Sequence, residues 1–375
     1  MKYFGAIFIL LSLACRGFAA CECGFAVNDT DSLHFGLFTD FLEADFLHAF
    51  NVTNASIGTT GWHPQVFNTS AEESNGDFGT SKQLGNIIAN PLPAEQWGGP
   101  PATVGETGLQ LWVRRDLEND LVPVAEISSP RNDMLYGSFR AAIKFSSMNG
   151  TCGAFFWYHN DTQEIDIEFL SKQHTVLDLT VHTPDSRQSN DDSDSDDSAL
   201  PANSTHYFSV IDFTDEYHEY RFDWLPDRVD YYIDGDHVKT FRGEVPNTPG
   251  HLMLGHWSNG NPDWSAGPPR QDAVITVGYV KAYFNVTTRD EPRQGCHDLS
   301  APDAVCVIPP QNRPPISNGK KTHFYSLPAK EEVPEHNDFP QPPSLHGQAA
   351  ITVVGGWRGS TWVMMVYLLV RRIMR

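Results

Sequence analysis

Residues 164–169 read Glu-Ile-Asp-Ile-Glu-Phe, and this alternation decides the fold class. Successive side chains of a β-strand point to opposite faces, so Glu164, Asp166 and Glu168 share one face while the apolar residues between them bury the other. Acidic residues are depleted in strands, and three on one face repel one another. The stretch therefore predicts a strand whose acidic face has a function. These three acidic residues are called here the acidic ladder. Taken alone, the ladder could instead be a polar strand edge exposed to solvent.

Short runs of aromatic and β-branched residues surround the ladder, separated by Gly, Pro, Asn and Asp. One hairpin is explicit: residues 228–233 lead into Asp234-Gly235, a pair that accommodates the positive φ of a tight turn, and residues 236–241 return. No long apolar stripe of helical period occurs between residues 21 and 295. This pattern predicts an all-β protein, an antiparallel β-sandwich or barrel. Further strands are expected over 136–145, 153–158, 164–170, 176–182, 218–224 and 274–285.

The net charge of the 375-residue chain excludes one class of partner. It has 26 basic and 47 acidic side chains, a formal charge of −21. Binding of duplex nucleic acid requires Lys and Arg to neutralise phosphates, so we expect no nucleic-acid partner. A hydrophobic content of 40% is enough for a sizeable core, which excludes global disorder.

The two ends of the chain differ in composition from its middle. Residues 1–20 combine Lys2, an apolar run and small residues near position 19, as in a cleaved signal peptide. Residues 296–350 are predicted to form a Pro-rich linker, and residues 351–375 carry an apolar stretch followed by arginines. That last segment is interpreted as a transmembrane span or a lipid-anchor signal, which would attach the protein to a membrane. The globular domain is then residues 21–295.

Export predicts an extracellular protein, either secreted or tethered to the cell surface. Eight Asn-x-Ser/Thr sequons agree with that location. They begin at Asn28, Asn51, Asn54, Asn68, Asn149, Asn160, Asn203 and Asn285. We expect the domain to act as a monomer.

Five cysteines remain after removal of the signal peptide, an odd number for an oxidising compartment. One thiol is therefore unpaired or intermolecular. We predict that Cys152 pairs with Cys21 or Cys23 and that Cys296 pairs with Cys306.

Residues 191–198 contain five aspartates, whose mutual repulsion predicts an extended, solvated loop. A structural calcium ion is the alternative interpretation. The spacing of an EF-hand and its distal Glu are absent, so we predict no metal and no cofactor.

The acidic face is suited to glycoside hydrolysis. That reaction needs one ionised carboxylate as nucleophile or base and one protonated carboxyl as acid, flanking the scissile bond. On a flat strand the Cα atoms of Glu164 and Glu168 would lie about 13 Å apart, whereas a retaining pair of carboxyls is about 5–5.5 Å apart. The interpretation therefore requires the strand to curve so that the long side chains converge.

These residues resemble the E-x-D-x-E signature of the family 16 glycoside hydrolases, retaining β-glucanases with a concanavalin-like jelly-roll fold. Further segments resemble the family in the same order, across roughly residues 35–290. They are residues 136–144, 154–158, 218–224 with the hairpin that follows, and 256–260. The resemblance implies an antiparallel β-sandwich jelly roll. Because no residue is inserted between Asp166 and Glu168, the motif is similar to the regular-strand branch of the family rather than the bulged one.

The resemblance also implies roles for individual residues. Glu164 would be the nucleophile, Asp166 its electrostatic helper and Glu168 the acid/base. Sugar rings stack on aromatic side chains, so Phe156 and Tyr158 are expected to line the substrate cleft while Trp157 lies in the core. Substrate-binding roles are likewise expected for four residues outside that strand: His182, Trp257, Asn259 and Trp264.

The predicted function is an endo-β-glucanase that hydrolyses β-1,3- or β-1,3/1,4-glucan with retention of configuration. The nearest alternative is a cell-wall glucan transglycosylase, which passes the same covalent intermediate to another sugar. A non-catalytic carbohydrate-binding lectin is the alternative from a different class. An enzyme with this carboxyl pair should have a bell-shaped pH profile on the acidic side of neutral, limited by ionised Glu164 and protonated Glu168.

Overall fold

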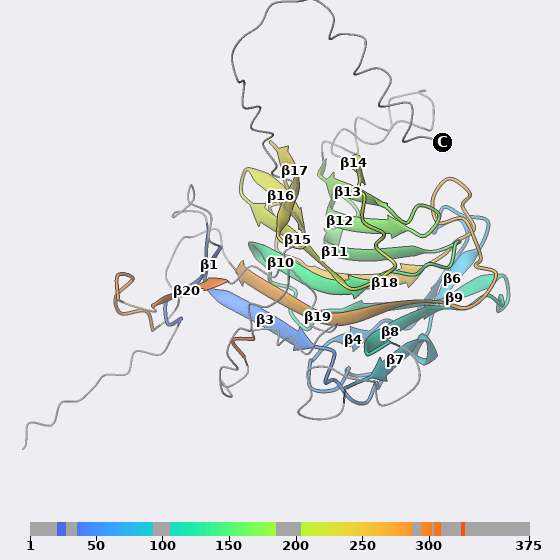
Figure 1. The fold of residues 1–375 in the computed structure, drawn as a ribbon, viewed down its shortest axis with the longest axis horizontal. Coiled ribbons are helices and arrows are strands. Elements are labelled where there is room, and N and C mark those ends of the chain that lie inside the picture. Colours follow the sequence, from blue (N-terminus) through green and yellow to red (C-terminus); the bar gives the residue numbers. More distant parts are fainter. Residues whose placement is uncertain are drawn as a thin grey trace, which may run out of the picture. The chain divides into compact units, whose positions relative to one another are not determined.

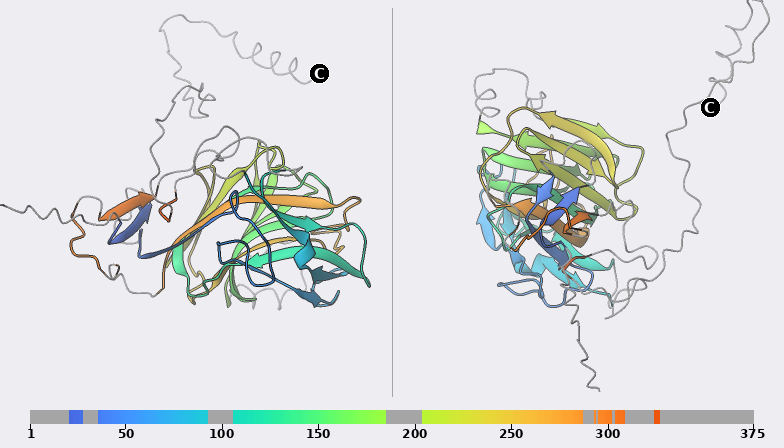
Figure 2. Two further views of the ribbon diagram at one scale, coloured as in Figure 1. Left: turned by 90° about the horizontal axis from the view of Figure 1, so that it is seen from below. Right: turned by 90° about the vertical axis from the view of Figure 1, so that its left-hand side faces the viewer.

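Two large β-sheets contain most of the residues that the structure, a computed structural model, describes (Figures 1 and 2). The described residues are 21–27, 36–92, 106–184, 204–286, 293, 295–301, 304–308 and 324–326. The predicted signal peptide, the Asp-rich block and the C-terminal apolar segment lie outside them. Within the described ranges, no helix is both long and apolar enough to cross a membrane.

The first sheet, called here the backing sheet, has eight strands among the described residues. Their order across the sheet is β17 (Asp236–Arg242), β16 (Arg228–Ile233), β15 (His218–Leu225), β10 (Leu135–Lys144), β19 (Ala273–Asn285), β8 (Gly108–Val113) and β7 (Ile87–Asn90), with β3 (Asp40–Asp45) paired to β19. The predicted hairpin joins β16 to β17. Its turn residues Asp234 and Gly235 have φ values of 50° and 83°, which confirms the tight turn.

The second sheet contains the acidic ladder and is called here the acidic sheet. It has nine strands among the described residues. Their order is β14 (Ser204–Phe208), β13 (Val176–His182), β12 (Gln163–Leu170), β11 (Cys152–Asn160), β18 (His251–Trp257), β9 (Leu121–Ser128), β6 (Gly79–Lys82) and β5 (Phe67–Thr69), with β4 (His63–Pro64) beside β9. A short 3-10 helix, η1 (Leu84–Asn86), precedes β7.

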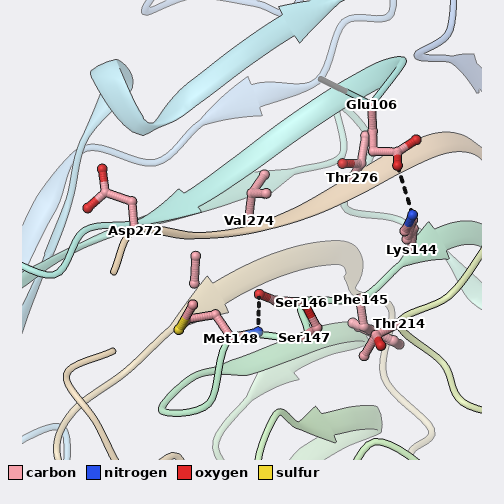
Figure 3. Close-up of a pocket in the computed structure, with 11 residues that line it drawn as sticks. Glu106, Lys144, Phe145, Ser146, Ser147, Met148, Thr214, Asp272, Val274 and Thr276 are labelled. Carbon is pink, nitrogen blue, oxygen red and sulfur yellow. Dashed lines mark hydrogen bonds and ion pairs between the residues drawn. The ribbon is translucent and has the colours of Figure 1, made fainter. Parts of the chain in front are cut away.

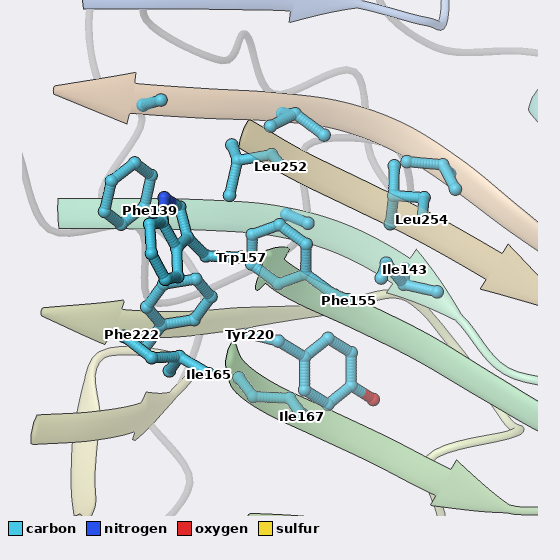
Figure 4. Close-up of a cluster of buried hydrophobic side chains, with 14 of the residues drawn as sticks. Phe139, Ile143, Phe155, Trp157, Ile165, Ile167, Tyr220, Phe222, Leu252 and Leu254 are labelled. Carbon is cyan, nitrogen blue, oxygen red and sulfur yellow. The ribbon is translucent and has the colours of Figure 1, made fainter. Parts of the chain in front are cut away.

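The core lies between these two sheets and is built from alternate residues of their strands (Figure 4). Ile165 and Ile167 of β12 are almost completely buried there. Trp157 of β11 packs on Trp224 of β15, with 4.3 Å between ring centroids, and its indole N–H donates to the Met134 carbonyl. Alternation then turns the other residues of β11 and β12 away from the core. The predicted sandwich and the core position of Trp157 are confirmed.

A third, small sheet joins the two ends of the described chain. Its central strand β1 (Gly24–Val27) pairs with β2 (Leu37–Phe38) and runs parallel to β20 (Val305–Ile308) (Figure 1). The structured residues therefore extend past the boundary at 295 expected from the sequence. Strand β20 lies in the range predicted to be a linker, and it is ordered because it completes a sheet with the N-terminal strand.

The predicted disulfide pairing was wrong. The bonds are Cys21–Cys306 and Cys23–Cys296, and Cys152 is a buried free cysteine. The reason is the pairing of β1 with β20, which brings residues about 280 positions apart into contact. Cys152 lies instead on β11 of the acidic sheet.

A second segment of the predicted linker contacts the backing sheet on its outer face. Phe324 packs edge-on against Tyr279, with 6.1 Å between ring centroids. The backbone N–H groups of Tyr325 and Ser326 donate to the Glu43 carboxylate at 3.2 and 2.8 Å. These contacts attach the chain downstream of β20 to strands β3 and β19.

Candidate active site

The acidic ladder lies in the middle of a regular part of the acidic sheet. Strand β12 pairs antiparallel with β11 on one side and β13 on the other, and the register from Glu164 to Glu168 continues without a shift on both sides. The expectation of a regular strand without an inserted residue is therefore confirmed. Because Ile165 and Ile167 are buried in the core, the three acids project from the opposite face.

Glu164, Asp166 and His182 form a compact group on this face. His182 ends β13 and lies directly across from Glu164. One side-chain oxygen or nitrogen of each residue lies within 4.8 Å of those of the other two, and the Nε2 atom of His182 is 3.6 Å from Oδ2 of Asp166. Ligand atoms at such spacing also suit a divalent cation, but hydrolysis by a carboxyl pair needs none. The histidine lies beside the acids, as expected.

Glu168 lies in a different environment from the other two acids. Its Oε1 atom is 3.3 Å from the thiol of Cys152, and the indole N–H of Trp264 also donates to its carboxylate. Burial, with the nearby negative charges of Glu164 and Asp178, raises the pKa of Glu168 to about 7, although the two donors oppose that rise. A carboxyl with this pKa is protonated in mildly acidic solution and able to act as a general acid.

A row of residues crosses the acidic sheet through Glu168. Strand register places Ala154 and Asp178 directly beside Glu168, and it continues to Glu126 on one side and His206 on the other. The full row is Glu126, Gly255, Ala154, Glu168, Asp178 and His206.

Glu126 and Asp178, the two other carboxylates of this row, each have a basic side chain as partner. Lys82 Nζ lies 3.6 Å from Glu126, and the imidazole of His206 contacts Asp178. Burial raises the pKa of both carboxyls, and the partners oppose that rise. Sequence reasoning missed Glu126 and Asp178 because each is a single acid in an otherwise ordinary strand. Asp178 stands between the apolar residues Leu177 and Leu179, and this alternation could have indicated that its side chain lies on the polar face of its strand.

The aromatic residues of β11 are arranged as the alternation predicts. Phe156 lies across from Asp166 and Tyr158 across from Glu164, so both share the face of the acids and both are partly buried. Their rings meet edge to face, with 6.4 Å between centroids, and the Tyr158 hydroxyl donates to Asp161. These two rings form an apolar floor beside Glu164 and Asp166.

Trp257 and Trp264, for which substrate-binding roles are expected, lie at the end of β18 and in the segment after it. Trp257 is the last residue of β18, lies across from Cys152 and packs on a small cluster that includes Val113 and Met148. Trp264 is partly buried because of its contact with Glu168. Neither indole is fully exposed, and Trp264 contacts the acidic ladder directly.

Asn259 is the one predicted site residue whose geometry argues against a contact with substrate. Its side chain is 3% exposed. The amide donates to the Ser74 carbonyl, and its oxygen accepts hydrogen bonds from the Ser265 hydroxyl and the Asn261 backbone. The expected substrate contact is corrected to a structural role, because the side chain holds its own loop to residues 74–76.

A pocket of about 270 Å³ lies elsewhere, beside the ends of β10 and β19 of the backing sheet (Figure 3). Its lining includes an ion pair between Lys144 and Glu106, 2.8 Å apart, together with Ser146 and Asp272. None of the predicted site residues lines it. We assign the chemistry to the acidic face, where the three acids of β12 lie together.

The fold and this face together define a class. One strand of an antiparallel β-sandwich presents three carboxyls flanked by aromatic rings. One of these carboxyls has a raised pKa and lies on the same face as a second acid. That combination fits proteins that cleave bonds between sugars.

Comparison with known proteins finds a matching family. Residues 95–277 match the family described as "Glycosyl hydrolases family 16". The matched range contains β12 with all three acids of the ladder.

Individual proteins are similar to parts of this chain. A β-glucanase of Acetivibrio thermocellus is 28% identical over 164 residues, which are 42% of this chain and 45% of that protein. Congo red hypersensitive protein 1 of Saccharomyces cerevisiae is 30% identical over 138 residues, 36% of this chain and 25% of that protein. The chain thus spans less than half the length of these relatives. A solved Bacillus licheniformis β-glucanase superimposes with a TM-score of 0.49 at 20% identity, covering 64% of this chain and 97% of that structure.

Proposed function

We propose that the domain is an endo-acting β-glucanase that hydrolyses β-1,3- or β-1,3/1,4-glucan by a retaining double displacement. The single observation that carries the proposal is the difference between two acids of one strand. Glu168 lies among hydrogen-bond donors and negative charges, and its pKa is raised to about 7. Glu164, four residues earlier on the same face of the strand, lies beside Asp166 and His182. One strand thus supplies an acid and a nucleophile.

In the first step the Glu164 carboxylate attacks the anomeric carbon, the bond from that carbon to the leaving sugar oxygen breaks, and Glu168 gives its proton to that oxygen. In the second step ionised Glu168 takes a proton from water. The water oxygen bonds to the anomeric carbon and Glu164 is released, so configuration is retained. Asp166 assists Glu164 electrostatically, and Phe156 and Tyr158 support sugar rings beside it.

The test measures reducing ends released from laminarin and lichenan, with chromatography of the first products. We expect shorter oligosaccharides and a loss of more than about a thousandfold in activity for Glu164→Gln and Glu168→Gln. Glu72→Gln, at an exposed position away from the ladder, is the matched control and should keep wild-type activity. Glucan that is bound but not cleaved by the wild type would support the lectin interpretation instead. Cleavage by Glu164→Gln at the wild-type rate would remove the catalytic role of Glu164.

Addition of unlabelled oligosaccharide acceptors separates hydrolysis from transglycosylation, because both pass through the same covalent intermediate. Products longer than the donor at initial times would identify the protein as a transglycosylase. Products no longer than the donor, at a rate independent of acceptor, would support hydrolysis.

We further propose that the protein is extracellular, a monomer, and attached to a membrane by its C-terminal segment. The signal-like residues 1–20 and the two disulfides support export. Exposed Asn51, Asn54 and Asn149 are accessible for glycosylation, whereas the Asn285 amide is engaged by Thr39 and Leu37. Glycopeptide mapping tests the extracellular location, and light scattering tests the monomeric state. Membrane attachment is tested by fractionation of the chain with and without residues 351–375. Unmodified sequons throughout, or equal solubility of both chains, would contradict the first and the third.

A further inference from the structure

The free thiol of Cys152 is part of the environment of the acid/base. Cys152 begins β11, and its neighbour on the same face, Ala154, lies directly across from Glu168. Cys152 and Glu168 are therefore diagonal neighbours, a relationship that usually separates Cβ atoms by about 7–8 Å. Because Ala154 contributes only a methyl group, the longer side chains can meet beside it. Sγ and Oε1 lie 3.3 Å apart.

The surroundings of Cys152 keep its thiol reduced and protonated, so that it can donate a hydrogen bond. Cys152 is completely buried, and the four other described cysteines are paired with one another. Burial and the nearby Glu168 raise the pKa of the thiol well above its usual value, so it keeps its proton while the carboxyl gains and loses one. A thiol is a weak donor. It can thus hold one carboxylate oxygen while stabilising the ionised form less than a hydroxyl donor would, which suits a group that must remain protonated.

The described groups around Glu168 include a second donor and several charges. The indole N–H of Trp264 donates to the carboxylate from the segment after β18. From its own strand Glu168 faces Glu164 and Asp166, and from β13 it faces Asp178, which contacts His206 of β14 and lies within electrostatic range of Lys172. Three strands away on the other side of the row, Glu126 pairs with Lys82. Among these groups of the described chain, the carboxylates repel Glu168, and Lys172 donates to the backbone carbonyls of Pro262 and Asp263.

We propose that Cys152 is a positioning residue for catalysis: its thiol holds Oε1 of Glu168 and directs the other oxygen, which carries the transferable proton, toward the sugar linkage. The proposal rests on the acid/base role of Glu168 given under Proposed function. Neither a disulfide nor thiolate chemistry takes part, and the cysteine does not touch the substrate.

The experiment compares Cys152→Val, which removes the donor at similar volume, with Cys152→Ser, which keeps a donor. Two substrates with the same glucan oligosaccharide are used, one with a sugar and one with a dinitrophenyl leaving group, because only the sugar needs a proton from the acid. We expect Cys152→Val to lower kcat/KM about fivefold for the sugar substrate and to leave the dinitrophenyl substrate unchanged, with KM hardly altered.

The pH profile supplies a second readout. Without the thiol the ionised form of Glu168 loses a donor, so the alkaline limb of kcat/KM should move to higher pH in Cys152→Val. Cys152→Ser should keep the wild-type dependence on leaving group, and its alkaline limb should lie at or below that of the wild type. Equal losses for both substrates in Cys152→Val, or no loss and no shift, would overturn the proposal.

Glu168→Gln, measured in parallel, distinguishes this proposal from the proposed function. If Glu168→Gln loses activity on the sugar substrate but keeps it on the dinitrophenyl substrate, the acid/base role holds, and Cys152 is judged on its own variants. If Glu168→Gln remains fully active on both, the proposed function fails, and the role of Cys152 fails with it. In the Glu168→Gln background, Cys152→Val should have no further effect on the sugar substrate.

Discussion

The imidazole of His182 lies next to two acids of the ladder. Its Nε2 atom is 3.6 Å from Oδ2 of Asp166, and its strand position is directly across from Glu164. The contact joins β13 to β12 on the face where the nucleophile projects. An imidazole at this point favours the ionised forms of both carboxylates whenever it carries a proton or donates one in a hydrogen bond. Its position therefore links the proposed nucleophile, Glu164, to its electrostatic helper, Asp166.

Replacement of His182 by Ala should lower kcat/KM on lichenan about tenfold, the equivalent of ~1.4 kcal/mol. The physical reason is the lost contact with Asp166, while burial of the core side chains is unchanged. His182→Gln, which can still donate, should recover part of the loss. Steady-state kinetics with the melting temperature as a control test this, and wild-type kinetics for His182→Ala would contradict it.

The alkaline limb of kcat/KM should fall near pH 7. Burial and neighbouring negative charges raise the pKa of Glu168 to about 7, and the proposed mechanism needs this carboxyl protonated in the free enzyme. Activity should therefore be present below pH 7 and decline about tenfold per pH unit well above it. Initial rates on lichenan from pH 4 to 10 provide the measurement. A rate that stays constant up to pH 9 would exclude Glu168 as the acid.

Glu168→Gln should stabilise the folded protein at high pH. A pKa raised from 4.5 to about 7 means that the folded state binds this proton more tightly than the unfolded state. The stability of the wild type then falls as pH rises from about 4.5 to 7, by at most about 3 kcal/mol at ~1.4 kcal/mol per pKa unit. Neutral Gln escapes this loss, so the advantage of the variant should be small at pH 4 and largest at pH 8.

Urea unfolding at these two pH values measures the difference. Glu72→Gln, whose wild-type carboxyl is exposed, serves as the control and should show no such trend. If the stability difference between Glu168→Gln and the wild type is the same at pH 4 and pH 8, the pKa of Glu168 does not differ between the folded and unfolded states, and the prediction is wrong.

The disulfides should stabilise the domain without taking part in catalysis. Cys23 and Cys296 are 273 positions apart, and a bond closing so long a loop contributes about 2–5 kcal/mol. The double variant Cys23→Ser/Cys296→Ser should therefore melt at lower temperature yet keep its kcat/KM at 25 °C, because neither residue lies in the acidic sheet. Under denaturing, non-reducing conditions, a chain starting at residue 21 should be alkylated at Cys152 alone. Labelling of any other cysteine would contradict the pairing.

Local periodicity was sufficient to predict the strands that carry the site. Glu164, Asp166 and Glu168 alternate with apolar residues, and because the period of a strand is a local property, their common face followed directly. The same reasoning put Phe156 and Tyr158 on one common face, and the family resemblance implied that this face lines the cleft. The Asp234-Gly235 turn was equally local. The family resemblance of these segments agrees with the match over residues 95–277.

Only the tertiary structure decided which side chains meet across strands. The predicted pairing of Cys152 failed because β1 and β20 come together from opposite ends of the chain, a long-range event with no local signal. Cross-strand register brought Asp178 beside Glu168, and it also left Cys152 free to contact that acid. Sequence thus determined the chemical groups on the acidic face, whereas the different environments of Glu164 and Glu168 arise from packing between strands distant in the chain.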